Sequence, residues 1–224
     1  MATGCKARFS TTLSLLTVLA MGGTWFFLLG SPEAGPRRSS QAEPAAGQAN
    51  LLPYRKVAPP RVLKEKYVNM RVTPYHDPKF YFEVAVPRSF KNQPVKVTRE
   101  QLKNDSSTPV PMAEFKPKKD DVLIEARYVR VPKGVTLDRF MNVFAKESGF
   151  RFIERQRGTF EGRQVEDALL SIDSPSLGRT LTRLTVSRRG DLIFMVAGSC
   201  REEAYPRWKQ AFAVAALSFS PTGK

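Results

Sequence analysis

Alternation of apolar and polar residues is clearest between positions 179 and 197. The side chains alternate in character from Leu181 to Arg188, the triplet Arg189-Gly190-Asp191 forms a turn, and an apolar run returns from Leu192 to Ala197. This pattern predicts a β-hairpin whose second strand is buried on both faces. The hairpin is the centre around which we expect the remaining elements to be arranged.

A helix is predicted after the hairpin, because the apolar residues then recur at steps of three and four. We interpret Gly198-Ser199-Cys200 as a turn and N-cap, with Glu202 and Glu203 in the first helical turn, where carboxylates favour the positive end of the helix dipole. The apolar positions are Tyr205, Trp208, Phe212, Ala215, Ala216 and Phe219.

Upstream of the hairpin, the pattern changes between the periods of strands and helices. A short helix is predicted at 98–103, with Thr98 and Gln101 as a capping pair, and a longer one at 136–148 with Thr136 as its N-cap. The predicted strands span 80–86, 111–115 as an edge strand, 122–131, 150–157 and 165–172. This order predicts one α+β sandwich domain with a mostly antiparallel sheet over residues 72–224.

The first 71 residues have a different character. Residues 1–30 contain an apolar run from Leu13 to Leu29 preceded by Lys6 and Arg8, which predicts a signal anchor or transmembrane helix. A cleaved signal sequence ending near Ala20-Met21-Gly22 and an organelle transit peptide are the alternatives. Residues 31–71, rich in small residues and proline up to Pro60, are predicted to be a flexible linker.

Composition limits the chemistry. The net charge of +15 and the pI near 10.1 favour an anionic partner such as phospholipid, nucleic acid or an acidic protein. The single His76 argues against a zinc site or a His-based triad, and Cys200 is interpreted as a buried apolar residue. Asp120 and Asp121 are interpreted as a solvated turn, with a weak cation site as the alternative. We expect no catalytic residue, metal or cofactor.

Arginine recurs across neighbouring strand candidates and defines a candidate interaction surface. If several of these side chains share one exposed sheet face, they present a cationic surface to phospholipid headgroups, an acidic partner or a nucleic-acid backbone. The alternative is that they keep a polar face soluble. Nucleic acid is the weaker candidate, because no stacked aromatic motif accompanies the arginines. The candidate residues are Arg151, Arg155, Arg157, Arg163, Arg183 and Arg188.

Three features together resemble a known fold family. A strand ends in Val-Pro and is followed by an aromatic residue (84–90), a long strand precedes a helix (122–148), and the run 185–199 leads to a last helix with Trp208 and Phe212. This combination is similar to the PsbP-like αβα sandwich, shared by the extrinsic photosystem II protein PsbP, a eukaryotic Ran-release factor and bacterial envelope proteins such as DcrB. It covers residues 72–220.

The resemblance implies a non-enzymatic accessory protein. Together with the leader, it leads us to expect an extracytoplasmic interaction module of an envelope complex, for which a secretion or conjugation apparatus is one candidate. We expect a single-pass protein of the inner (cytoplasmic) membrane with its C-terminal domain in the periplasm, or an exported soluble protein if the leader is cleaved. A basic domain that binds an anionic polymer or lipid surface is the alternative function.

Overall fold

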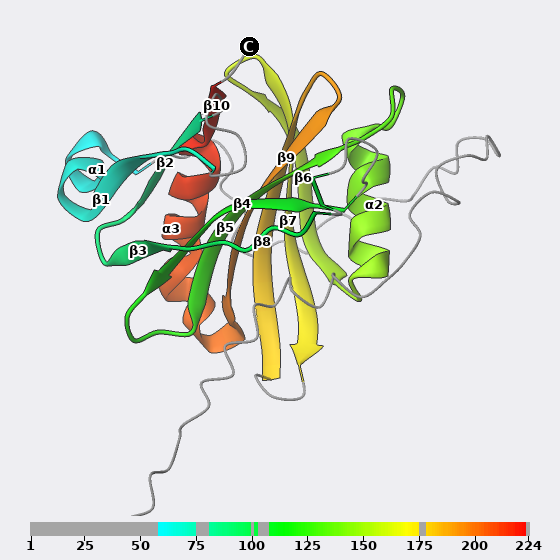
Figure 1. Cartoon of the computed structure of the whole chain (residues 1–224). Coiled ribbons are helices and arrows are strands. Elements are labelled where there is room, and N and C mark those ends of the chain that lie inside the picture. Colours follow the sequence, from blue (N-terminus) through cyan, green and yellow to red (C-terminus); the bar gives the residue numbers. More distant parts are fainter. Residues whose placement is uncertain (1–57, 75–80, 100, 103–107, 175–177, 223–224) are drawn as a thin grey trace, which may run out of the picture.

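The computed structural model of the protein describes residues 58–74, 81–99, 101–102, 108–174 and 178–222 (Figure 1). In chain order, their elements are α1 (Pro60–Lys66), β1 (Tyr67–Val72), β2 (Tyr81–Pro87), β3 (Phe90–Gln93), β4 (Val110–Pro117), β5 (Val122–Arg130), α2 (Leu137–Glu147), β6 (Arg151–Phe160), β7 (Arg163–Ser174), β8 (Gly178–Arg189), β9 (Leu192–Arg201), the 3₁₀ turn η3 (Glu202–Ala204), α3 (Tyr205–Ser218) and β10 (Ser220–Thr222).

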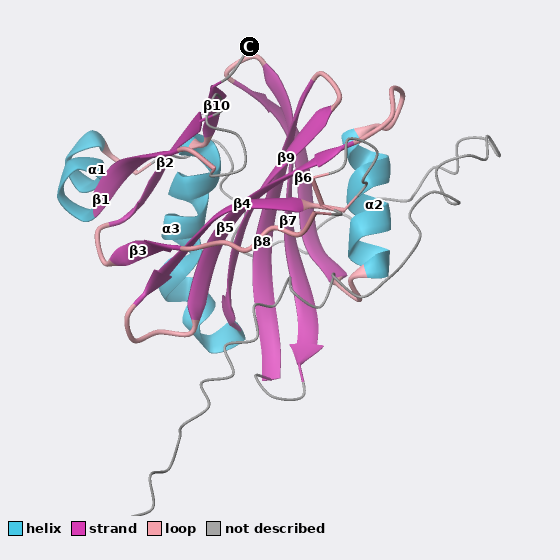
Figure 2. Cartoon of the chain, viewed as in Figure 1, coloured by secondary structure: helices cyan, strands magenta, loops and turns pink. Residues whose placement is uncertain are grey.

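An antiparallel sheet of seven strands in the order β3-β4-β5-β9-β8-β7-β6 is the central layer. A smaller antiparallel sheet has the order β1-β2-β10. Figure 2 shows α3 near the smaller sheet and α2 at the other flank of the molecule. The fold is therefore α+β with a mostly antiparallel sheet, as the sequence predicts.

The predicted hairpin is formed by β8 and β9, and β9 is buried on both faces. Phe194 and Val196 belong to the core that includes α3, whereas Ile193 and Met195 belong to the core under α2. Successive side chains of a strand point to opposite faces, so an unbroken apolar run is what a strand covered on both sides requires.

The core around α3 joins the two sheets. Phe219, directly after α3, has its ring centroid 5.2 Å from that of Phe82 in β2 and 5.8 Å from that of Phe194 in β9. Burial of an aromatic side chain of this size contributes about 1.5–3 kcal/mol to stability. The small sheet, α3 and the large sheet therefore share one apolar core.

Helix α2, predicted at 136–148, covers the opposite face of the large sheet. The side chain of Thr136 accepts a hydrogen bond from the backbone N–H of Arg139 at 3.1 Å, which satisfies one of the unpaired donors of the first turn. Phe140, Met141 and Phe144 are buried against β7 and β8. The apolar spacing at 137–144 thus specifies both the helix and its buried side.

The segment Gly198-Ser199-Cys200 lies within β9, so its interpretation as a turn and N-cap is wrong. A Cβ atom on Gly198 would lie 2.2 Å from Cδ1 of Phe212, so glycine allows α3 to approach the strand closely. Glu202 is in η3, one turn before α3, and the backbone N–H of Tyr205 donates to its carbonyl. Small residues at the end of a strand resemble a turn in the sequence, because the helix that requires them to be small is not apparent there.

The folded part begins earlier than predicted. Residues 60–71, expected to belong to the linker, lie in α1 and β1, and β1 pairs with β2 from Tyr67↔Pro87 to Val72↔Phe82. The predicted anchor, the linker up to 57 and His76 lie outside the described residues. Within the described ranges, no helix is long and apolar enough to cross a membrane.

Two further local predictions need correction. Strand β4 is not an edge strand, because β3 pairs with it on one side and β5 on the other. Thr98 and Gln101 do form the predicted reciprocal hydrogen bonds, at 2.9 and 3.3 Å. The described residues of the predicted helix, 98, 99, 101 and 102, are coil and turn, whereas 100 and 103 lie outside the described residues.

Candidate interaction surface

Strand β6 is the last strand at one edge of the seven-stranded sheet, with β7 as its neighbour. Phe152 and Ile153, at its start, are 38% and 40% exposed. Only Leu102 joins them as an exposed large apolar side chain in the part of the chain that the structure describes. An exposed apolar pair on an edge strand is the most distinctive surface feature of these residues.

A β-bulge interrupts the pairing of β6 with β7 at Ile153. Phe152 lies opposite Leu170 and Glu154 lies opposite Leu169, so Ile153 is an extra residue without a cross-strand partner. Such an insertion shifts the alternation of faces by one position. The bulge therefore leaves Ile153 outside the ladder and changes which residues of β6 share a face, whereas Phe152, opposite Leu170, lies on the face toward α2.

The predicted cationic face is not formed, because the six arginines divide between the two faces of the sheet. Cross-strand pairing places Arg151, Arg163 and Arg183 on the face toward α3 and the other three, Arg155, Arg157 and Arg188, on the face toward α2. The bulge separates Arg151 from its neighbours in β6, although all three have odd sequence numbers.

Arg155 and Arg157 join β6 to α2 and β7. Arg155 donates to Glu166 at 3.0 Å and to Asn142 at 2.7 Å, and its Nη2 lies 3.1 Å from a carboxylate oxygen of Asp138. Arg157 contacts Asp138 and lies 3.3 Å from Glu166. Two positive and two negative groups form this cluster, so it adds no net charge to the surface.

Arg183 lies inside the protein, so its assignment to an exposed surface is wrong. Its side chain is 1% exposed and donates to Asp167 at 3.0 and 2.5 Å, and Thr185 donates to the same carboxylate at 2.7 Å. Its Nη1 atom has no hydrogen-bond partner among the described residues. Desolvation, partly offset by this guanidinium, raises the pKa of the nearby Tyr205. This network is structural.

The remaining candidates also have partners. Arg188 donates to the carbonyl of Gly190 at 2.8 Å and to that of Val135. Arg151 is well exposed and lies 3.8 Å from Asp173. Arg151, Phe152 and Ile153 are three consecutive exposed residues at the start of β6, and we name them the β6 edge surface.

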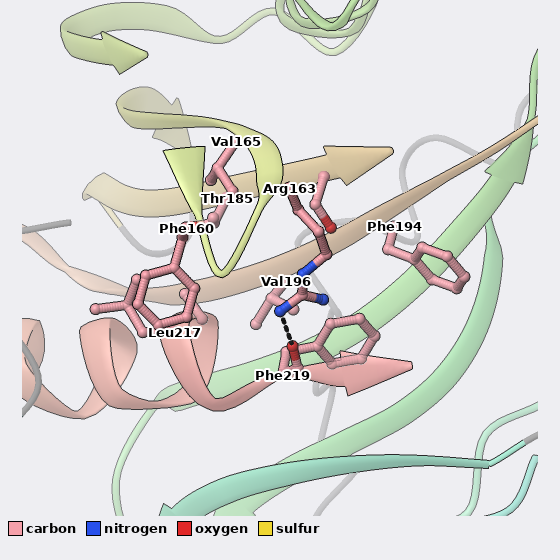
Figure 3. A pocket seen from close by; sticks show the side chains of 10 residues that line it. Phe160, Arg163, Val165, Thr185, Phe194, Val196, Leu217 and Phe219 are labelled. Atoms are coloured by element: carbon pink, nitrogen blue, oxygen red, sulfur yellow. Dashed lines mark hydrogen bonds between the residues drawn. The ribbon is translucent and has the colours of Figure 1, made fainter. Parts of the chain in front are cut away.

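A small pocket lies where the β6–β7 turn meets the end of α3 (Figure 3). Arg163 spans it and donates from Nη2 to the carbonyl of Phe219 at 3.3 Å, and Phe160 and Leu217 line it. Its volume is about 20 Å³, which suits a water molecule and is far below that of an organic substrate site.

A buried carboxylate lies in β5, on the same sheet face as α2. Glu125 accepts from Nε of Arg127 at 2.8 Å, and burial raises the pKa of its carboxyl group. Within the described ranges, no cluster of His, Cys, Asp and Glu has the arrangement of a metal site. Asp120 and Asp121 instead pair with Arg207 and Arg201, each at 3.4 Å.

The sequence pattern missed the role of Ile153, because a bulge breaks the alternation without a residue that announces it. Phe150, the first residue of the strand predicted at 150–157, is buried before β6 begins. The irregular edge is visible only in the structure, where the consecutive residues Arg151, Phe152 and Ile153 are all exposed.

Comparison with known proteins finds likeness in solved structures. No family model matches the chain, and no curated protein matches it. The cyanobacterial PsbP (CyanoP) of Synechocystis is similar, with 14% identity, a TM-score of 0.49 and coverage of 69% of this chain and 92% of that chain.

Two bacterial proteins are also similar in structure. PA94 of Pseudomonas aeruginosa, described as a putative regulator, has 7% identity and a TM-score of 0.43, covering 70% of this chain and 99% of its own. LpqN, involved in cell envelope biogenesis of Mycobacterium tuberculosis, has 11% identity and a TM-score of 0.46, covering 75% and 98%. The likeness to these structures concerns the fold alone.

Proposed function

We propose that the protein is a membrane-anchored, extracytoplasmic accessory protein that binds a protein partner of an envelope complex without catalysing a reaction. A secretion or conjugation apparatus is a candidate host. The contact with the partner is made through the β6 edge surface. The exposed pair Phe152 and Ile153 is the observation that carries this proposal.

The composition of the β6 edge surface suits a protein contact. Aromatic residues and arginine are enriched in protein interfaces, and a sheet edge can accept a further strand or a side-chain contact from a partner. Arg155 supports the ring of Phe152 from behind, because its guanidinium carbon lies 5.1 Å from the ring centroid. Because Arg155 donates a hydrogen bond to Glu166, the guanidinium that contacts the ring of Phe152 is held in place.

The location follows from the leader. The apolar run from Leu13 to Leu29, preceded by Lys6 and Arg8, supports a single-pass anchor in the cytoplasmic membrane with the domain in the periplasm. Cleavage of the leader, giving an exported soluble protein, is the alternative. Alkaline phosphatase fused after Lys224 tests export, because the reporter is active only outside the cytoplasm.

The contact itself is tested by photo-crosslinking in cells that produce the full chain. We expect a photoreactive amino acid at Ile153 to give one discrete adduct on illumination, and Phe152→Asp to suppress that adduct. The matched control carries the photoreactive residue at Lys146, an exposed position of α2. The same adduct from both positions, or an adduct insensitive to Phe152→Asp, refutes the assigned surface.

Direct binding of an anionic polymer or lipid surface is the second candidate function. It is favoured by the distribution of charge, since residues 58–99 contain nine basic and three acidic residues. The arginines predicted for this role are engaged in ion pairs or backbone contacts, so the basic N-terminal part of the domain is its better location. Loss of association at high salt is the signature to measure.

A further inference from the structure

The surplus of positive charge in the folded region is concentrated at its start. Nine basic residues face three acidic ones over 58–99, against twenty-one and sixteen over the three-times-longer segment 100–224. The described residues of the first segment form α1, β1, β2 and β3, and α1 lies at the opposite flank of the molecule from α2 (Figure 1). The excess of positive charge therefore lies at the flank of the molecule that α1 occupies.

Arg88, in the β2–β3 turn, connects this turn to the end of α1 by hydrogen bonds. The guanidinium of Arg88 donates to the carbonyl oxygens of Lys64 at 2.9 Å and Glu65 at 3.2 Å, and its backbone N–H donates to that of Lys66 at 3.0 Å. These bonds satisfy carbonyls at the end of α1 and fix the turn against the helix. Arg88 is thus held against the end of α1 that carries Lys64 and Lys66.

A fourth cation extends the group along the sheet edge. Lys91, three residues after Arg88, is exposed on β3 and lies within about 10 Å of it along the chain. We name Lys64, Lys66, Arg88 and Lys91 the α1 basic end. Its four side chains are exposed and have no ion pair within the part of the chain that the structure describes, whereas the neighbouring Glu65 is bound by Arg61 at 2.9 Å.

The chain enters the domain at this same end. Helix α1 begins at Pro60, and thirty residues separate it from Leu29, the last residue of the apolar run. A flexible chain of that length has a root-mean-square span of about 30 Å. An anchor at such a distance gives the α1 basic end a high effective concentration at the membrane, so a weak contact is enough to orient the domain.

We propose that the α1 basic end rests on anionic phospholipid headgroups of the membrane that holds the leader, an inference that depends on the proposed anchoring. Three of its four cations are lysines, compact charges on flexible stems that suit a fluid array of phosphates. Arg88 is committed to α1 through its two carbonyl contacts, so it has little freedom for paired recognition of a fixed carboxylate.

The test uses the full chain reconstituted in vesicles. A fluorophore is attached to Ser89→Cys in the β2–β3 turn, in a chain carrying Cys5→Ser; Cys200 is buried and stays unlabelled. Its quenching by a lipid with a spin-labelled headgroup is compared between vesicles with about 30% phosphatidylglycerol and vesicles of phosphatidylcholine alone. We expect quenching in the anionic vesicles, removal of that quenching at 0.5 M NaCl, and none with a fluorophore at Lys146→Cys.

The variant Lys64→Gln/Lys66→Gln should lower the equilibrium constant for docking on the anionic vesicles about 25-fold, since each basic residue near an anionic surface raises that constant roughly fivefold. The control Lys133→Gln/Lys146→Gln changes net charge equally and should leave quenching unchanged. A chain that does not float with the vesicles overturns the anchoring and this inference together. If the chain is anchored but its quenching is the same in anionic and neutral vesicles, or falls equally in both variants, this inference alone is overturned. An acidic protein partner at this end is then the favoured interpretation.

Discussion

Removal of Asp167 tests the buried arginine directly. Arg183 and Asp167 are each 1% exposed, and the carboxylate accepts two hydrogen bonds from the guanidinium and one from Thr185. Asp167→Ala removes all three bonds and leaves a buried positive charge without its counter-ion. Loss of one partner of a buried pair destabilises proteins by about 3–5 kcal/mol, because the remaining charge is neither hydrated nor neutralised.

A double substitution separates the charge from the packing. In Asp167→Leu/Arg183→Met the volume is largely kept and both charges are gone, a change that is often neutral or stabilising. We therefore expect the double variant to be more stable than Asp167→Ala by at least about 3 kcal/mol. Urea denaturation of a fragment starting at Ala58 measures both free energies of unfolding, provided that the m-values agree.

The outcome that refutes this reasoning is specific. If Asp167→Ala lowers the free energy of unfolding by less than about 1 kcal/mol, the guanidinium reaches water and behaves as a surface cation. This outcome is possible because the Nη1 atom of Arg183 has no hydrogen-bond partner within the described residues, so a water molecule could bind there. A large cost in both the single and the double variant would instead show that shape, not charge, dominates at this site.

Three other experiments have defined outcomes. Gly198→Ala forces a Cβ to within 2.2 Å of Phe212, so we expect a loss of about 1–3 kcal/mol in urea denaturation, partly restored by Phe212→Leu. Burial raises the pKa of the Cys200 thiol to about 12, so it should react with a disulfide reagent near pH 8 only after unfolding, and rapid labelling of the folded chain contradicts this. Burial also raises the pKa of Glu125, which makes its contribution to stability complete below the unfolded pKa and lost as pH rises through the folded pKa. Glu125→Gln should therefore gain stability relative to the wild type as pH rises above the unfolded pKa of the carboxyl group, and a difference that does not change with pH disproves it.

Local patterns predicted those elements whose partners are close in sequence. The hairpin of β8 and β9 needs only its own alternation and a turn at Gly190, where φ is +62°. Helix α2 needs its cap at Thr136 and an apolar face, and both are local. These elements were confirmed because the physical causes of their formation lie within about twenty residues.

Features that depend on distant segments were not predictable in this way. Polar residues on alternate positions of β8 suggested solvent, yet the helix α3 covers that face and Asp167 supplies the charge that Arg183 needs. Helix α1 and strand β1 were assigned to the predicted linker, and they fold because β2 offers an edge to β1 and Arg88 caps α1. Tertiary contacts decided these cases against local propensity.

The two proposed contacts occupy opposite edges of one sheet. The α1 basic end includes Lys91 on β3, and the β6 edge surface ends the other side of the seven-stranded order. A domain that rests on its membrane through the first edge presents the second edge away from the lipid, where a partner can reach Ile153. Lys64→Gln/Lys66→Gln should then lower the yield of the Ile153 adduct without changing its identity, because the substitutions alter orientation and leave the partner's contact intact.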